Sequence, residues 1–212
     1  MKITQILSMA LVAGAVAMTS CSEAPKTPAP TETNASNAWA GKVNVNVDNA
    51  ASIVSWKGEM IGGLYGHKGT VALKESSLEL TDGKVSGGSF TIDLNTIQAT
   101  DDNYNPKEGK TPENLIGHLT TPDFFDVANY PTASFVITSV EGDKAKGNLT
   151  VRGVTNEETI ENIVVTTNGD DVKITGKLTF DRQKYGVAYS TGSKDVILSD
   201  DIEINVELNG KK

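Results

Sequence analysis

The nine residues VKITGKLTF, from Val172 to Phe180, alternate between two kinds of side chain. Val172, Ile174, Leu178 and Phe180 fall on one face of an extended chain, and two lysines and two threonines fall on the other. Successive side chains of a β-strand point to opposite faces of the sheet. The alternation therefore predicts a strand with one buried face and one solvated face.

The same alternation recurs on the N-terminal and C-terminal sides of this segment. VNVNV at 43–47, SFTIDL at 89–94 and IEINVEL at 202–208 each carry an apolar residue at every second position. One wet face per strand is typical of antiparallel sheets. We count about eight to nine such strand candidates in a single domain.

Turn sequences separate the predicted strands. TDGK at 81–84, EGDK at 141–144 and NGDD at 168–171 combine glycine with aspartate or asparagine, which favours tight hairpin turns. The apolar faces of so many strands need cover, and one short helix cannot provide it. The sheet must therefore close into a barrel or fold into a sandwich.

One segment is predicted to be helical. TPENLIGHL begins with Thr111, a suitable N-cap, followed by Pro112 at the first helical position. Apolar side chains then recur at helical spacing. TPDFFD at 121–126 is a candidate for a second short helical turn. The sequence thus predicts an all-β fold with one or two short helices.

The chain begins with a short apolar segment after Lys2. The segment 6–18 is too short to span a bilayer, which needs about 20 residues, and its charge pattern and length fit a secretory signal. Two alternative cleavage sites fit the sequence. The residues 15–17 form an A-x-A site, whereas 18–21 resemble a bacterial lipobox, in which the final cysteine becomes lipid-modified. Met18 stands at the first lipobox position, where leucine is usual.

Cys21 is the only cysteine in the chain, and its place directly after the apolar segment favours the lipobox. We therefore predict a signal peptide at 1–20, a lipidated disordered tether at 21–41 and a folded domain at 42–212. Residues 22–40 are rich in Pro, Thr, Asn, Ser and Ala and bury too little apolar surface to fold. Several acyl chains on Cys21 give stable membrane anchoring.

This N-terminus predicts an exported protein, anchored by Cys21 to a bacterial membrane and facing the periplasm or the cell surface. Ser22 follows the lipid-modified position, where aspartate is associated with inner-membrane retention in some bacteria. The serine therefore favours the outer membrane.

Charge and composition exclude other classes of protein. Lys plus Arg number 19 and Asp plus Glu number 27, which gives a net charge of −8. An acidic chain is a poor partner for nucleic acid, whose phosphates require basic patches. A single cysteine excludes an internal disulfide and a cysteine zinc cluster.

The sequence offers little catalytic chemistry. His67 and His118 are the only histidines, and no G-x-S-x-G element is present. Asp101 and Asn103 have the spacing of calcium-loop ligands, but Pro106 stands where that loop requires glycine. We expect no catalytic residue and no metal site, and we predict that the protein is not an enzyme.

Five stretches in order resemble the YceI-like family of polyisoprenoid-binding proteins. They cover nearly all of residues 42–208 and are SIVSWKG at 52–58, GGSFTIDLNTI at 87–97, HLTTPDFFDVANYPTASFVI at 118–137, GNLTVRGVT at 147–155 and LTFDRQKYGV at 178–187. Two positions depart from the family pattern. Tyr185 stands where phenylalanine is common, and residues 156–158, after the predicted strand LTVRGVT, are more polar than usual.

The resemblance implies an extended antiparallel barrel of about eight strands, similar to lipocalins, with an apolar tunnel. It also implies an isoprenoid lipid in that tunnel, in some members the tail of an isoprenoid quinone, and no other cofactor. The predicted ligand-binding wall consists of apolar side chains, with those from 115 to 125 near the mouth: Trp56, Val71, Leu73, Phe90, Ile92, Leu115, Leu119, Phe124, Phe125, Phe135, Ile137, Leu149, Val151, Ile174, Leu178 and Phe180.

The leading hypothesis is a membrane-tethered protein that binds or carries an isoprenoid lipid. One alternative is a structural or stress-related surface lipoprotein whose barrel is filled by its own side chains. Another is an enzyme acting on a lipid head group, with polar residues such as His118 and Asp123 inside the barrel. A homodimer formed through exposed strand edges is also left open.

Overall fold

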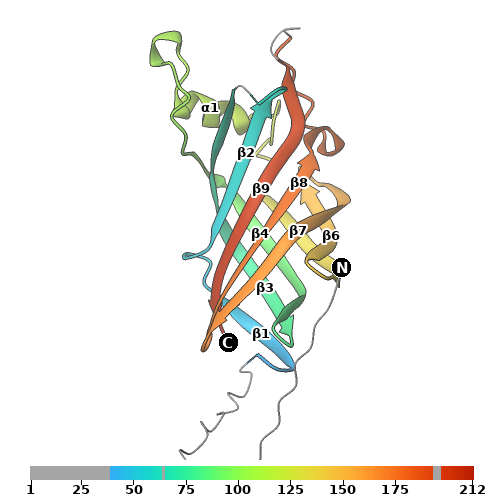
Figure 1. Ribbon diagram of the computed structural model, residues 1–212. Coiled ribbons are helices and arrows are strands. Elements are labelled where there is room, and N and C mark those ends of the chain that lie inside the picture. Colours follow the sequence, from blue (N-terminus) through green and yellow to red (C-terminus); the bar gives the residue numbers. More distant parts are fainter. Residues whose placement is uncertain (1–38, 64, 193–196) are drawn as a thin grey trace, which may run out of the picture. The chain divides into compact units, whose positions relative to one another are not determined.

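Eight antiparallel strands close into a barrel in the computed structural model, which describes residues 39–63, 65–192 and 197–212 (Figure 1). The predicted signal peptide, Cys21 and most of the predicted tether lie outside these residues. The described residues form nine strands, of which all but β1 make up the ring: β1 (Lys42–Val47), β2 (Ile53–Met60), β3 (Gly66–Thr81), β4 (Lys84–Ala99), β5 (Thr132–Glu141), β6 (Lys144–Val151), β7 (Val154–Asn168), β8 (Asp171–Asp181) and β9 (Leu198–Lys211). The ring runs β3-β2-β9-β8-β7-β6-β5-β4 and closes through pairing of β4 with β3. The predicted antiparallel barrel is confirmed.

Tight hairpins connect the long strands. Residues Thr81 and Lys84 pair across one two-residue turn, Glu141 and Lys144 across the next, and 168 and 171 across a third. These are the three turns predicted from TDGK, EGDK and NGDD. Glycine supplies a positive φ in each of them, as such turns require.

A fourth hairpin turn corrects the sequence prediction that LTVRGVT forms one strand. Residues 151 and 154 pair, and Arg152 and Gly153 between them have φ angles of 50° and 72°. The left-handed conformation is unfavourable for arginine, but Nη1 of Arg152 donates to the carbonyl oxygens of Phe124 at 2.6 Å and Gly186 at 2.8 Å. These long-range contacts, which the local sequence does not show, hold the turn.

Two short strands in succession occupy the position between β3 and β9. At one end β2 pairs with residues 66–71 of β3 and with residues 198–207 of β9. At the other end β1 pairs with residues 78–81 of β3 and with residues 210–211 of β9. The additional strand β1 therefore extends the barrel wall beyond the point where β2 begins.

Side chains of the loop between β1 and β2 bridge the break in this wall. On the β3 side, Nδ2 of Asn49 donates to the carbonyl oxygen of Lys74 at 3.0 Å, and Oγ of Ser76 donates to Oδ1 of Asn49 at 2.6 Å. On the β9 side, the backbone N–H of Asn209 donates to Oγ of Ser52 at 3.0 Å. The loop thus supplies hydrogen bonds that a continuous strand would have made.

The β1 end of the barrel is filled by apolar side chains. Trp39 is buried there, and its Nε1 donates to the carbonyl oxygen of Gly169 in the β7–β8 turn at 3.0 Å. Val43, Val45 and Leu80 are buried in the same cluster. Packing of the described chain therefore begins at Trp39, three residues before the predicted domain boundary.

The opposite end carries the helix α1 (Pro112–Leu119), together with the 3-10 turns η1 (Pro106–Glu108) and η2 (Arg182–Tyr185). Oγ1 of Thr111 accepts from the N–H of Asn114, and Pro112 occupies the first turn, as predicted. TPDFFD forms a hydrogen-bonded turn without a helix. Within the described ranges, no helix has the length and apolar character needed to cross a membrane.

The loop that bridges the broken wall generates a stability prediction. Asn49→Ala removes both hydrogen bonds to β3 and should lower the free energy of unfolding by about 1–2 kcal/mol, measured by urea denaturation. Asn44→Ala is the matched control, because Asn44 is exposed on β1 and its side chain makes no hydrogen bond to a described residue. Equal effects of the two substitutions would show that the loop does not support the wall.

Candidate ligand-binding cavity

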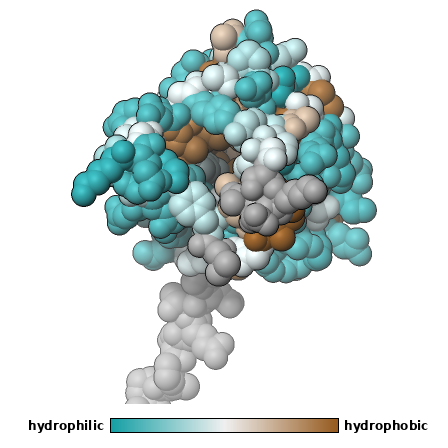
Figure 2. All heavy atoms as spheres, turned by 90° about the horizontal axis from the view of Figure 1, so that it is seen from above, coloured by the Kyte–Doolittle hydropathy of each residue, from teal (hydrophilic) through white to brown (hydrophobic). Residues whose placement is uncertain are grey.

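The barrel encloses a cavity of about 370 Å³. This volume lies within the range of small-molecule binding pockets. Leu115, His118 and Leu119 of α1 line it, so the cavity reaches the end of the barrel that carries the helix. Seen from that end, the surface is hollowed, and hydrophobic side chains border the hollow (Figure 2).

Partly buried side chains show that the interior is not filled along its whole length. Phe90 and Ile92 of β4 and Ile204 and Val206 of β9 line the cavity, yet each is only half-buried. A side chain that points into a filled core loses nearly all of its exposed surface, as Leu80 does near β1. The half-buried residues therefore face open space inside the ring.

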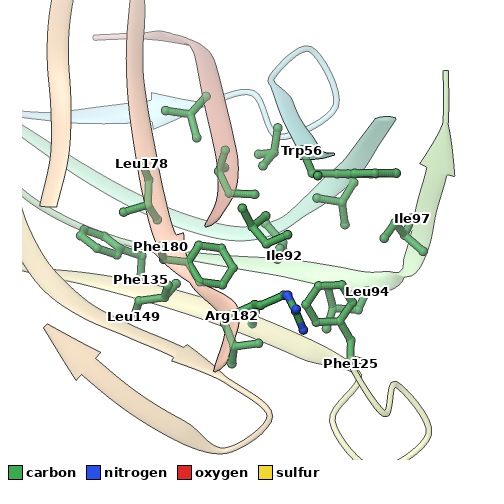
Figure 3. Close-up of a pocket in the computed structure, with 18 of the residues that line it drawn as sticks. Trp56, Ile92, Leu94, Ile97, Phe125, Phe135, Leu149, Leu178, Phe180 and Arg182 are labelled. Carbon is green, nitrogen blue, oxygen red and sulfur yellow. The ribbon is translucent and has the colours of Figure 1, made fainter. Parts of the chain in front are cut away.

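All sixteen predicted wall residues line this cavity. Figure 3 shows several of them, including Trp56, Ile92, Phe135 and Phe180, converging on the same space. By element they are Trp56 of β2; Val71 and Leu73 of β3; Phe90 and Ile92 of β4; Leu115 and Leu119 of α1; Phe124 and Phe125 of the following loop; Phe135 and Ile137 of β5; Leu149 and Val151 of β6; and Ile174, Leu178 and Phe180 of β8. Their role in binding stays a prediction.

The sequence-based set omitted the contributions of β7 and β9. Ile160 and Ile163 of β7 line the cavity, as do Ile202 and Ile204 of β9. The alternation in β9 is regular and could have identified its members. In β7 the register shifts between residues 161 and 164, and this irregularity hides the period of two.

Arg182 is the only lysine, arginine, aspartate or glutamate among the described lining residues. Its guanidinium lies among the wall side chains in Figure 3, and the residue is 2% exposed. Sequence reasoning missed it, although a signal was available. Val172, Ile174, Leu178 and Phe180 point inward at even positions, and Arg182 continues that alternation beyond the end of β8.

A hydrogen-bonded cluster of polar side chains stands at the rim. Nδ1 of His67 lies 3.1 Å from Oδ1 of Asp101, and Nε2 of His67 lies 2.9 Å from the hydroxyl oxygen of Tyr65. The ring of Tyr104 stacks on His67 with centroids 4.9 Å apart. His67 and Tyr65 line the cavity, so this cluster connects its mouth to the loop after β4.

The surroundings of Asp101 shift two pKa values. Burial raises the pKa of the Asp101 carboxyl, but the backbone N–H groups of Lys68 and Asn103 and the ring of His67 outweigh it, and the net pKa lies below its ordinary value. Burial, followed by the charge of Asp101 and the hydrogen bond to it, raises the pKa of Tyr104 to about 12. The carboxylate is therefore held in its charged form.

The second histidine packs against aromatic rings. His118 meets Phe124 and Tyr189 edge-on, with centroid distances of 4.9 and 4.6 Å. Asp123 is exposed, and no hydrogen bond joins it to His118 among the described residues. The pair that motivated a lipid-modifying enzyme therefore does not form a joint site.

The two departures from the family pattern are partners in the structure. The Tyr185 hydroxyl donates to Oε1 of Glu158 at 3.0 Å, and Nδ2 of Asn156 donates to the carbonyl oxygen of Lys184 at 3.3 Å. Burial, then the hydrogen bond to Glu158, raises the pKa of Tyr185 above its ordinary value. Tyr185 does not line the cavity. The polar first residues of β7 therefore hydrogen-bond to η2 and do not line the cavity.

Comparison with known proteins matches the family model described as "YceI-like domain" to residues 45–210. A UPF0312 protein of Staphylococcus aureus (strain USA300) is 33% identical over 104 residues, which are 46% of this chain and 61% of that protein. The crystal structure of Burkholderia cenocepacia BcnA superposes with a TM-score of 0.60 and 22% identity over 77% of this chain and 99% of that one. A Campylobacter jejuni YceI protein gives a TM-score of 0.47 at 22% identity, over 61% of this chain and 75% of that one.

The Asp101 carboxyl generates a pH prediction. A carboxyl group whose pKa is lower in the folded than in the unfolded state stabilises the fold above its ordinary pKa and loses this contribution as the pH falls through the folded value. Asp101→Asn should therefore reduce the unfolding free energy by about 1–3 kcal/mol at pH 7 and flatten its decline below about pH 4, measured by urea denaturation across pH.

Asp102→Asn provides the control for that measurement. Asp102 is exposed, and its side chain makes no hydrogen bond to a described residue. An Asp101→Asn protein with the stability and pH profile of this control would refute the stabilising role assigned to the rim carboxylate.

Proposed function

The chain belongs to the YceI-like domain family, and on that basis we propose that it is a membrane-tethered protein that holds or carries an isoprenoid-type lipid in its barrel. Barrels of this family bind apolar ligands. The proposal adds the class of lipid, the anchoring of the protein and its export.

The observation that carries the proposal is the apolar cavity inside the ring. Transfer of one methylene group from water into such a site contributes about 0.8 kcal/mol, so ten give about 8 kcal/mol before the costs of association. An isoprenoid chain carries no polar atoms along its length and requires no matched hydrogen bonds from the wall. The same physics predicts weak discrimination between chains that differ by one methylene.

The proposed tether rests on the sequence alone. Cys21 and residues 22–40 lie outside the described part of the structure. Anchoring through acyl chains on Cys21 would hold the barrel near a source of apolar ligand, and export would place both in the periplasm or at the cell surface. Ser22 supports the outer membrane, and the homodimer stays a prediction.

The alternative of a filled, purely structural barrel receives less support. It requires inward side chains to occupy the interior, whereas Phe90, Ile92 and Ile204 are half-buried and face the cavity. Side chains fill the barrel around Leu80, near β1. Part of the interior is thus core, and all sixteen predicted wall residues border the remaining space.

A substitution that fills the cavity tests the proposed binding. Ile137 points into the cavity from β5, and its neighbour Val136 is 45% exposed on the outer face. Ile137→Trp should weaken the binding of geranylgeraniol at least about tenfold by occupying its space, measured by displacement of a neutral apolar fluorophore. Val136→Trp adds the same bulk outside the barrel and should leave the affinity unchanged. Equal affinities of both variants and the parent would contradict binding inside the barrel.

Native mass spectrometry identifies the ligand directly. The protein, purified from a bacterial periplasm without detergent or added lipid, should retain an apolar species that fragments as an isoprenoid. A protein that carries no such species and fails to take up geranylgeraniol in titration would overturn the proposed function.

A further inference from the structure

We propose that Arg182 forms a polar part of the binding site and donates hydrogen bonds to a neutral carbonyl or hydroxyl oxygen at one end of an otherwise apolar ligand. The inference rests on the proposed function, because it assigns one end of the same lipid to one side chain of the same cavity. It commits the ligand class to isoprenoid alcohols, ketones and quinones rather than hydrocarbons or acids.

The guanidinium of Arg182 lies in the wall of the cavity. Arg182 is buried, and it lines a cavity whose other described walls are almost entirely apolar. In Figure 3 its nitrogen atoms lie among the wall side chains. A charged group in such surroundings is costly unless its hydrogen bonds are made, so the sequence carries this cost at an inward position where an apolar residue would fit the alternation of β8.

The protein does not use all the hydrogen-bond donors of Arg182. A guanidinium has five N–H donors. Nε donates to the carbonyl oxygen of Ser199 at 3.0 Å, Nη1 donates to that of Val187 at 2.6 Å, and Nη2 donates to Oδ1 of Asp200 at 3.0 Å. One N–H on each of the two terminal nitrogens is therefore left without an acceptor among the described residues. An acceptor oxygen on a ligand in the cavity would satisfy donors that the protein does not.

The charge of Arg182 is already balanced within the protein, which favours a neutral over an anionic head group. Arg182 already forms a salt bridge with Asp200, whose side chain is 49% exposed, so the carboxylate stays hydrated while the guanidinium is buried. The pair is neutral overall. A ligand carboxylate would bring a second, uncompensated negative charge into an apolar cavity, whereas a carbonyl or hydroxyl oxygen would bring none.

A purely structural role would not require this position. Arg152, the other arginine of the chain, ties two carbonyl oxygens at the same end of the barrel, and it does not line the cavity. The bonds from Arg182 to Val187 and Ser199 likewise connect η2 to β9. Arg152 shows that such ties can be made from outside the cavity, so they do not by themselves explain why Arg182 lies in the cavity lining.

The experiment measures four matched probes on the purified full-length protein at pH 8. They are geranylgeraniol, geranylgeranylacetone, geranylgeranoic acid and the corresponding hydrocarbon without a terminal oxygen, each competing with a neutral apolar fluorophore. Arg182→Met should weaken the binding of the alcohol and the ketone by about tenfold or more, because each loses a hydrogen bond donated by a charged group. The affinity for the hydrocarbon should change less than about twofold. Arg152→Met is the matched control and should change none of the four.

A second variant tests the charge argument and does not depend on the stability of Arg182→Met. Asp200→Asn keeps the size of the side chain and removes the negative charge that balances the guanidinium. The affinity for the acid relative to the alcohol should rise about tenfold. A merely structural Arg182 would leave this ratio unchanged.

The outcomes separate the two proposals. If the parent protein binds no probe, the hydrocarbon included, the proposed function is wrong and this inference falls with it. If the parent binds the probes but Arg182→Met weakens all four equally or none, and Asp200→Asn leaves the acid-to-alcohol ratio unchanged, the head-group site is wrong while the proposed function stands. Selective loss of the alcohol and ketone, or a shifted ratio in Asp200→Asn, supports the site.

Discussion

Closure of the sheet is the constraint on which the rest of the structure depends. Pairing of β4 with β3 completes a ring of eight antiparallel strands, so alternate side chains of every strand must point into one shared interior. A ring of this size is just wide enough to be filled by side chains or to hold one small ligand. The size and placement of the inward residues then decide which of the two occurs at each level.

The two ends of the barrel resolve that choice differently. Near β1 the interior is closed by Trp39 and Leu80, and the additional strand lengthens the wall where β2 does not reach. Farther from β1, Phe90 and Ile92 in the middle of β4 and Ile204 and Val206 of β9 remain half-buried because they border the cavity, whereas Leu94 and Ile97, closer to α1, are buried. A filled end near β1 and a cavity farther along the ring give the barrel both a packed core and space for a ligand.

Polar groups at the end of the barrel that carries α1 are of two kinds: some stabilise the fold, and others line the cavity. Arg152 binds carbonyl oxygens outside the cavity, and Tyr185, which does not line the cavity, binds Glu158 of β7. Arg182 and His67 instead line the cavity, each neutralised or oriented by a carboxylate placed behind it, Asp200 and Asp101 respectively. This arrangement leaves the inner faces of Arg182 and His67 next to the space where a ligand would lie.

The sequence by itself determined the strands, three of the hairpin turns, the cap of α1 and the apolar wall, because these depend on local periodicity and on glycine at positions of positive φ. It missed the turn at Arg152, whose left-handed conformation is held by carbonyl oxygens more than 25 residues away in the chain. Only the tertiary structure decided that β1 and β2 share one place in the wall, that the interior is filled near β1 and holds a cavity farther along the ring, and that Arg182 meets Asp200. The physical reason is the same in each case: pairing across the ring, residual volume and the balance of buried charge are properties of groups that only closure of the barrel brings together.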